Sequence, residues 1–174
     1  LYLFDGSHLQ TPGMMSHKNY ANYTTFLEAE LAVMQDMGYK IDRRAFFGRS
    51  IYNDNQTIVN NDGYFARNED GAAYTSEYSQ VPLGVGLHIY GSNNNVTQNA
   101  NILTVGTGAA GVRVDGLSNT LNVAENTESH SDGYRGKGIL VAYGRNHTIN
   151  QTGTVSATGE GGVGAEFNFG SSSN

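Results

Sequence analysis

The chain has 174 residues, contains 23 Gly and no Cys, and carries a formal net charge of −6 at pH 7. This balance argues against nucleic acid as a partner, because the sequence has no basic stripe to neutralise phosphates. The absence of Cys excludes a disulfide scaffold and a thiolate zinc site. No apolar run approaches the ~20 residues that a membrane-spanning helix needs.

The first four residues form an apolar, strand-like run that has no apolar partner nearby in the sequence. Neither an initiator Met nor a signal segment precedes this run. We therefore expect the chain to be part of a longer polypeptide.

Residues 5–17 place two histidines on either side of a Pro-Gly turn and a Met-Met pair. These histidines are His8 and His17, and a neutral imidazole nitrogen can bind Zn²⁺. Met15 lies between them, at a turn that precedes the predicted helix. The alternative is that both histidines are ordinary loop residues and that Met14 and Met15 belong to a core, and the sequence leaves both interpretations open.

The sequence predicts one helix, from about residue 25 to residue 37, because apolar side chains recur there at helical spacing. Thr25 and Glu28 fit the capping box that marks a helix N-terminus, and Gly38 fits the left-handed position that follows a C-terminus. The apolar face of this helix needs a packing partner, and residues 1–4 and 41–47 are the local candidates.

Residues 1–48 resemble the C-terminal part of a zinc metallopeptidase domain of the metzincin type, in which a zinc-binding His precedes a tight turn with a Met beneath the metal. The resemblance implies that His8 is the third zinc ligand, with His17 as the substitute, and that Met15 is the Met of the turn. The H-E-x-x-H motif, which supplies two ligands and the general base, is absent from the chain. The chain alone is therefore expected to be inactive, and the zinc cofactor would belong to the longer protein.

Residues 49–81 are predicted to connect the helix to the second half of the chain or to cap that half. Turn signals separate short apolar stretches here. The aromatic side chains of this segment are Tyr52, Tyr64, Phe65, Tyr74 and Tyr78. They would cover the open end of a solenoid, which is the favoured interpretation, or form a carbohydrate-stacking surface.

One phrase returns four times in residues 82–174. It reads GLHIYG at 86–91, GVRVDG at 111–116, GILVAYG at 138–144 and GAEFNFG at 164–170, with leading glycines 25, 27 and 26 residues apart. Such a period is typical of a solenoid, and the alternation within each phrase is typical of a strand. We predict a mainly β fold, a parallel β-helix with coils of about 25–27 residues preceded by a small helical segment. The expected inward rows are Leu87, Ile89, Val112, Val114, Ile139, Val141, Ala165 and Phe167.

Charged residues within the coils allow two interpretations. Asp115 and Glu166 stand close to the same coil offset and could form an acid pair such as polysaccharide-cleaving β-helices use. The favoured alternative is that Asp115, Glu166 and Arg113 are solvated charges on the outside of the ladder.

The chain as a whole resembles part of a bacterial autotransporter passenger, on the strength of Met15-Ser16-His17, residues 28–32, residues 41–44 and the coil phrases. The resemblance implies a peptidase-like end at 1–48, a connecting segment at 49–81 and a β-helix stalk at 82–174. It also implies secretion to the cell surface, an outer-membrane β-barrel downstream, and a host-surface glycan or protein as partner. The expected role is structural or adhesive, and the alternative is the rear part of a zinc metalloendopeptidase. An unfinished coil end also predicts self-association.

Overall fold

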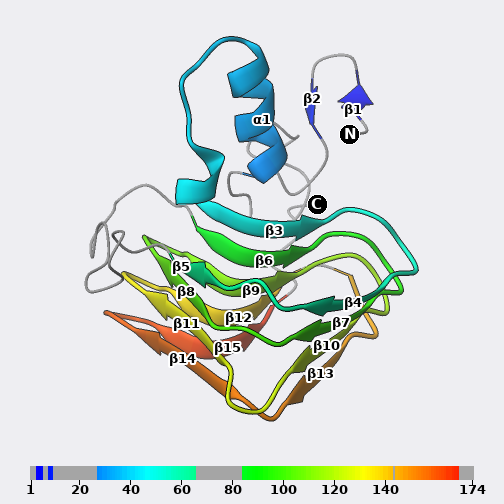
Figure 1. The fold of residues 1–174 in the computed structure, drawn as a ribbon, viewed down its shortest axis with the longest axis vertical. Coiled ribbons are helices and arrows are strands. Elements are labelled where there is room, and N and C mark those ends of the chain that lie inside the picture. The colour runs from blue at the N-terminus through cyan, green and yellow to red at the C-terminus, as the bar shows by residue number, and fades with distance from the viewer. Residues whose placement is uncertain (1–2, 6–7, 10–26, 66–83, 143, 169–174) are drawn as a thin grey trace.

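The computed structural model describes residues 3–5, 8–9, 27–65, 84–142 and 144–168. Within these ranges the chain forms a parallel β-helix with one α-helix at one end (Figure 1). The predicted fold class is therefore confirmed. A separate antiparallel pair, β1 (Leu3–Asp5) and β2 (His8–Leu9), precedes the helix.

The coil strands stack into three parallel sheets, one strand of each coil in each sheet. Sheet 1 contains β3 (Phe47–Ile51), β6 (Val85–Ile89), β9 (Ala110–Val114), β12 (Lys137–Val141) and β15 (Val163–Phe167). Sheet 2 contains β4 (Thr57–Asn60), β7 (Asn95–Gln98), β10 (Thr120–Val123) and β13 (Thr148–Gln151). Sheet 3 contains β5 (Tyr64–Phe65), β8 (Ile102–Val105), β11 (Glu128–Asp132) and β14 (Thr154–Thr158).

The coils begin earlier than the sequence analysis placed them. Strands β3, β4 and β5 pair in parallel with β6, β7 and β8, so the first coil starts at Phe47. The described part of the segment 49–81 is therefore coil rather than connection. The regular repeat of the sequence did not reveal this coil, because its spacing differs. Phe47 and its partner Val85 are 38 residues apart, whereas Val85 and its partner Ala110 are 25 apart.

The predicted inward rows form the core of the β-helix. Six of the eight residues are buried in one apolar cluster, which also contains Val96, Ile102, Leu121 and Val123: Leu87, Ile89, Val112, Val114, Ile139 and Val141. Ala165 and Phe167 continue the rows in register with Ile139 and Val141. Phe167 is nevertheless 65% exposed, since β15 has a strand neighbour on one side alone within the described residues.

The corners use residues that tolerate a left-handed backbone. The residue two positions before each strand of sheet 2 has a positive φ: 58° at Asn55, 57° at Asn93, 54° at Ser118 and 60° at Asn146. Asn is among the few residues with a side chain that adopts this conformation at low cost. The Asn-rich runs of the sequence are therefore corner residues of successive coils.

The helix α1 (Glu28–Asp36) begins later than predicted. Leu27 precedes its first turn, and the Glu30 carboxylate accepts a hydrogen bond from the Leu27 backbone N–H at 2.8 Å. The predicted capping role of Glu28 is therefore wrong, and Thr25 lies outside the described residues. Glu28 instead pairs with Arg43. At the other end, Gly38 takes the predicted left-handed conformation, with a φ of 97°.

The helix covers the first-coil end of the β-helix. Leu31 of α1 packs on Phe47 of β3 and Val85 of β6, with Met34, Ile41 and Phe46 at the edge of this cluster. A short 3-10 helix, η1 (Arg43–Ala45), joins the helical part to β3. Packing of residues 41–47 beneath the helix is therefore confirmed. Figure 1 shows α1 above β3, at the opposite end from β13 and β14.

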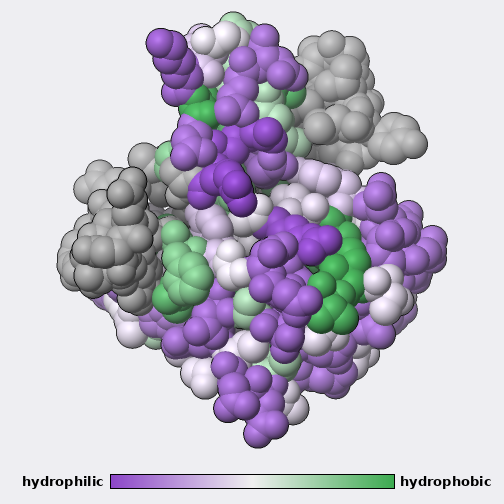
Figure 2. Space-filling model, viewed as in Figure 1, coloured by the Kyte–Doolittle hydropathy of each residue, from purple (hydrophilic) through white to green (hydrophobic). Residues whose placement is uncertain are grey.

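The surface in this view is mostly hydrophilic, and a few separate apolar patches interrupt it (Figure 2). In the described ranges, none of the helices has the length and apolarity needed to cross a bilayer.

Candidate functional site

The outward face of sheet 3 carries a charged and hydroxylated cluster. In β11 the side chains alternate, and Ser129 and Ser131 are fully buried while Glu128, His130 and Asp132 are not. This alternation follows from the strand geometry, which sends successive side chains to opposite faces. The inward hydroxyls are satisfied, because Ser129 donates to the Gly138 carbonyl at 2.8 Å and Ser131 to the Ala109 carbonyl at 3.1 Å.

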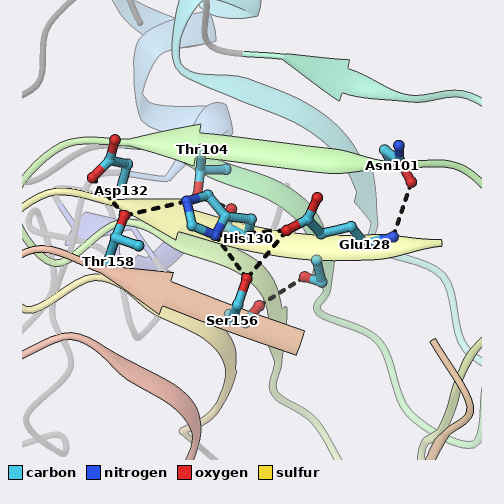
Figure 3. A network of polar contacts seen from close by, with 9 residues as sticks. Asn101, Thr104, Glu128, His130, Asp132, Ser156 and Thr158 are labelled. Atoms are coloured by element: carbon cyan, nitrogen blue, oxygen red, sulfur yellow. Dashed lines mark hydrogen bonds and ion pairs between the residues drawn. The ribbon is translucent and has the colours of Figure 1, made fainter. Parts of the chain in front are cut away.

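The next coil places two hydroxyl groups beside this strand. In β14, Ser156 stands in register with His130, and Thr158 stands in register with Asp132. His130 Nδ1 lies 2.8 Å from Ser156 Oγ, and His130 Nε2 lies 3.3 Å from Thr158 Oγ1. Ser156 donates to a Glu128 carboxylate oxygen at 3.2 Å, and Thr158 donates to Asp132 at 2.7 Å (Figure 3). We call these five residues the sheet 3 cluster.

Each hydroxyl of the sheet 3 cluster lies between the His130 ring and a carboxylate. Each hydroxyl has one hydrogen, and both hydroxyls give it to a carboxylate. Both ring nitrogens of His130 therefore lie against a hydroxyl oxygen that is itself bonded to a carboxylate.

Polar contacts from the preceding coil hold β11 in place. Asn101 accepts a hydrogen bond from the Glu128 backbone N–H at 2.9 Å, and the Thr104 hydroxyl donates to the His130 carbonyl at 3.2 Å. Strand β11 is therefore held by polar contacts from the preceding coil as well as from the following coil.

The geometry differs from that of a nucleophile, base and acid relay. In such a relay the acid contacts the imidazole directly. Here the carboxylate of Glu128 lies 3.9 Å from His130 Nδ1, and Asp132 reaches the ring through the Thr158 hydroxyl. The arrangement therefore suits binding by fixed donors and acceptors better than attack by an activated Ser156.

A second charged group lies beneath the surface. His88 Nε2 is 2.6 Å from an Asp115 carboxylate oxygen, and Arg113 Nε is 3.0 Å from the same oxygen. All three residues are buried. Burial acts to raise the pKa of Asp115, but Arg113 and His88 outweigh it and hold the pKa below its ordinary value.

This group corrects the interpretation of the coil charges. Asp115 and Arg113 are not solvated ladder charges, because they pair with each other inside the protein. Glu166 lies two strands away from β9 in sheet 1 and interacts with Lys137 at 3.5 Å. The two carboxylates therefore have different partners and do not form the alternative acid pair.

The predicted metal residues fall largely outside the described part of the chain. Met15 and His17 lie outside it, and His8 is placed by its backbone alone, in β2 opposite Asp5 of β1. Among the described residues, no group of three or more His, Asp or Glu side chains is arranged to hold a metal ion. The zinc assignment therefore stays a prediction.

The predicted aromatic surface is divided between two environments. Tyr64 belongs to the buried core, whereas Phe65 is exposed. Tyr52 packs on Tyr90 and donates its hydroxyl to Glu28. Tyr74 and Tyr78 lie outside the described residues. The three aromatic side chains that the structure places thus do not form one stacking platform.

Sequence reasoning missed the sheet 3 cluster. The E-S-H-S-D alternation of residues 128–132 has the period of a strand, but Ser occupies its inward positions where apolar residues were sought. The contribution of Ser156 and Thr158 depends on the coil-to-coil register, which only the stacking defines.

Comparison of the chain with protein-family models, with curated proteins and with solved structures finds no match.

Proposed function

We propose that the chain is a rigid β-helix segment of a secreted, surface-displayed bacterial protein of the autotransporter passenger type. Its role is structural and adhesive, and its sheet 3 cluster contacts a glycan or protein on a host surface. The observation that carries the proposal is the outward row of donors and acceptors that neighbouring coils fix against each other.

Fixed side chains favour binding for a physical reason. Polar side chains that bridge two coils have already lost much of their rotational freedom, so less conformational entropy is lost when a partner binds. Glu128, Asp132 and Thr158 remain accessible to solvent at the edge of the cluster. Hydroxyl-rich glycans and polar protein surfaces offer the complementary donors and acceptors.

The stalk role is supported by the stacking itself. Each coil contacts the coils before and after it, so a solenoid extends in one direction as coils are added. The inward rows stay in register over successive coils, which gives a stiff rod rather than a flexible linker.

Adhesion is tested by measuring how the labelled protein binds to cultured epithelial cells, before and after the cells are treated with glycosidases. The double variant Ser156→Ala/Thr158→Val removes both bridging hydroxyls, and we expect it to weaken binding about tenfold. The matched control is Asn122→Ala, which removes side-chain bonds to Asn95 and Asn150 on the neighbouring coils of sheet 2. Absence of binding by the native chain, or an equal loss in both variants, would overturn the adhesive role.

Display is tested with an antibody against the chain. We expect the antibody to label intact cells that produce the full-length protein. Labelling restricted to permeabilised cells would contradict surface display.

A further inference from the structure

A polar cavity of about 750 Å³ lies where the helical end of the molecule meets the first coil. Strongly hydrophilic residues gather at this junction in Figure 2. The side chains that matter for its chemistry are Arg44, Arg49, Asn61, Asp62, Tyr64 and Phe65. A cavity of this size is in the usual range for small-molecule sites.

Tyr64, which lines the cavity, has a buried hydroxyl group without a partner. Tyr64 is 8% exposed, and its hydroxyl forms no hydrogen bond within the protein. Burial and the nearby charge of Asp42 both raise the pKa of Tyr64, so the hydroxyl remains a neutral donor. Buried polar groups are nearly always paired, and an unpaired one calls for a missing partner.

The floor of the cavity is polar where later coils are apolar. Arg49 of β3 occupies the row that holds Leu87 and Val112 in the next two coils. Its guanidinium donates to Asn60 at 3.0 Å. Asn60 is itself buried and donates to Gln98 at 2.7 Å, in the row that continues as Val123. The first coil thus carries a supported group of polar side chains in place of a closed apolar core.

The charges around the cavity favour a neutral ligand over an anion. Two guanidinium groups, of Arg44 and Arg49, and two carboxylates, of Glu28 and Asp62, belong to residues that line the cavity. An anion attracted by the guanidinium groups would be repelled by these carboxylates. Phe65 adds an apolar ring that is 52% exposed, and such a ring suits the C–H face of a sugar.

We propose that this cavity binds a neutral mono- or disaccharide, with the Tyr64 hydroxyl donating to a sugar oxygen and Arg49 helping to hold the sugar. The site lies at the first coil, apart from the sheet 3 cluster, and does not depend on the adhesive role.

The proposal is tested by calorimetric and ligand-observed NMR titration of the whole chain with maltose, cellobiose, lactose and N,N′-diacetylchitobiose, each at up to about 10 mM, a range that detects millimolar affinity. We expect at least one of these sugars to bind. Tyr64→Phe removes only the hydroxyl and should weaken that binding about three- to tenfold. The matched control Tyr134→Phe, at an exposed tyrosine of another coil, should leave it unchanged.

Arg49→Gln provides a second variant and should also weaken the binding. Circular dichroism checks that each variant folds. Inorganic phosphate is the anion probe and should not compete with the sugar. The proposal is overturned if none of the four sugars binds the native chain, if both variants bind as well as the control, or if phosphate displaces the sugar.

Discussion

Asp115 allows the charged side chain of Arg113 to be buried. Arg113 points to a covered face of sheet 1, where its permanently charged guanidinium needs a counter-charge. Asp115, two residues further along, supplies that charge and also accepts the hydrogen bond of His88. The cluster therefore belongs to the structure of sheet 1, and its three members are mutually dependent.

Replacement of Asp115 should be strongly destabilising. Asp115→Asn removes the charged carboxylate that pairs with the buried Arg113 and His88, and we expect the free energy of unfolding to fall by about 3–5 kcal/mol in chemical denaturation. The control is Glu166→Gln, at a more exposed pair with Lys137, which should cost less than about 1 kcal/mol. Similar losses of unfolding free energy in the two variants would show that the Asp115 cluster contributes no more to stability than the pair of Glu166 and Lys137.

The same carboxylate predicts a pH dependence. Its pKa is lowered on folding, so its contribution is present above the ordinary Asp value of about 4 and is lost as the pH falls below that value. The native chain should therefore lose stability between about pH 4 and pH 2 more steeply than Asp115→Asn. Thermal melts across this range measure the difference, and parallel curves would contradict the assignment.

The zinc prediction also concerns single residues. If His8 is a ligand from an incomplete site, the chain should bind Zn²⁺ weakly, because two imidazoles leave most of the coordination sphere to water. Zinc titration of the native chain, His8→Ala and His17→Ala decides between the two histidines. If both variants bind Zn²⁺ as well as the native chain, neither His8 nor His17 is the predicted metallopeptidase ligand.

At the scale of the element, the corners define how closely coils can stack. Gly116 has a φ of 71°, and an added Cβ would lie 2.3 Å from the carbonyl oxygen of Gly91 in the coil before it. Only a residue without a side chain permits this approach. The corners after β9 and β12 thus depend on Gly for space as well as for conformation, since Gly144 also combines a positive φ with a close approach to the preceding coil.

Gly116→Ala separates these two demands when it is compared with Gly108→Ala. Gly108 has a similar φ of 69°, but nothing lies within 4 Å of its added Cβ. We expect a loss of about 1 kcal/mol for Gly108→Ala, from backbone strain alone, and about 2–4 kcal/mol for Gly116→Ala. If the two variants lose the same free energy of unfolding, the Gly91 carbonyl can move away from the added Cβ without a cost in stability.

The elements differ in how far the sequence defines them. Rows such as Leu87, Val112 and Ile139 were predictable because apolar alternation repeats at a constant period. Strand β11 was not, because its inward positions hold Ser whose hydroxyls bond to the backbone. The sheet 3 cluster joins residues 26 and 28 positions apart, and only the register brings them together.

At the scale of the whole molecule, the two ends of the β-helix differ. Helix α1 covers the first coil through Leu31, whereas β15 leaves Phe167 exposed. Within the described ranges β15 is paired along one edge alone, and an apolar side chain beside an unpaired strand edge invites pairing with another chain.

We therefore expect uneven protection along the coils. Amide hydrogen exchange should be slow in β9, which is paired on both sides, and fast in β15, and the chain should self-associate as its concentration rises. Exchange mass spectrometry and sedimentation measure these properties. Uniformly slow exchange in a monomer would contradict this expectation.

The unequal lengths of the coils have a consequence for how such a protein changes in evolution. The path from Phe47 to its partner Val85 is 38 residues, and the path from Val85 to Ala110 is 25, yet the three strands share one continuous register. The corner that leads from sheet 3 back to sheet 1 thus accepts additional sequence while the ladder is preserved. Lineages can gain new surface there by insertion, and protein engineers can graft a foreign peptide at the same corner, without redesigning the core.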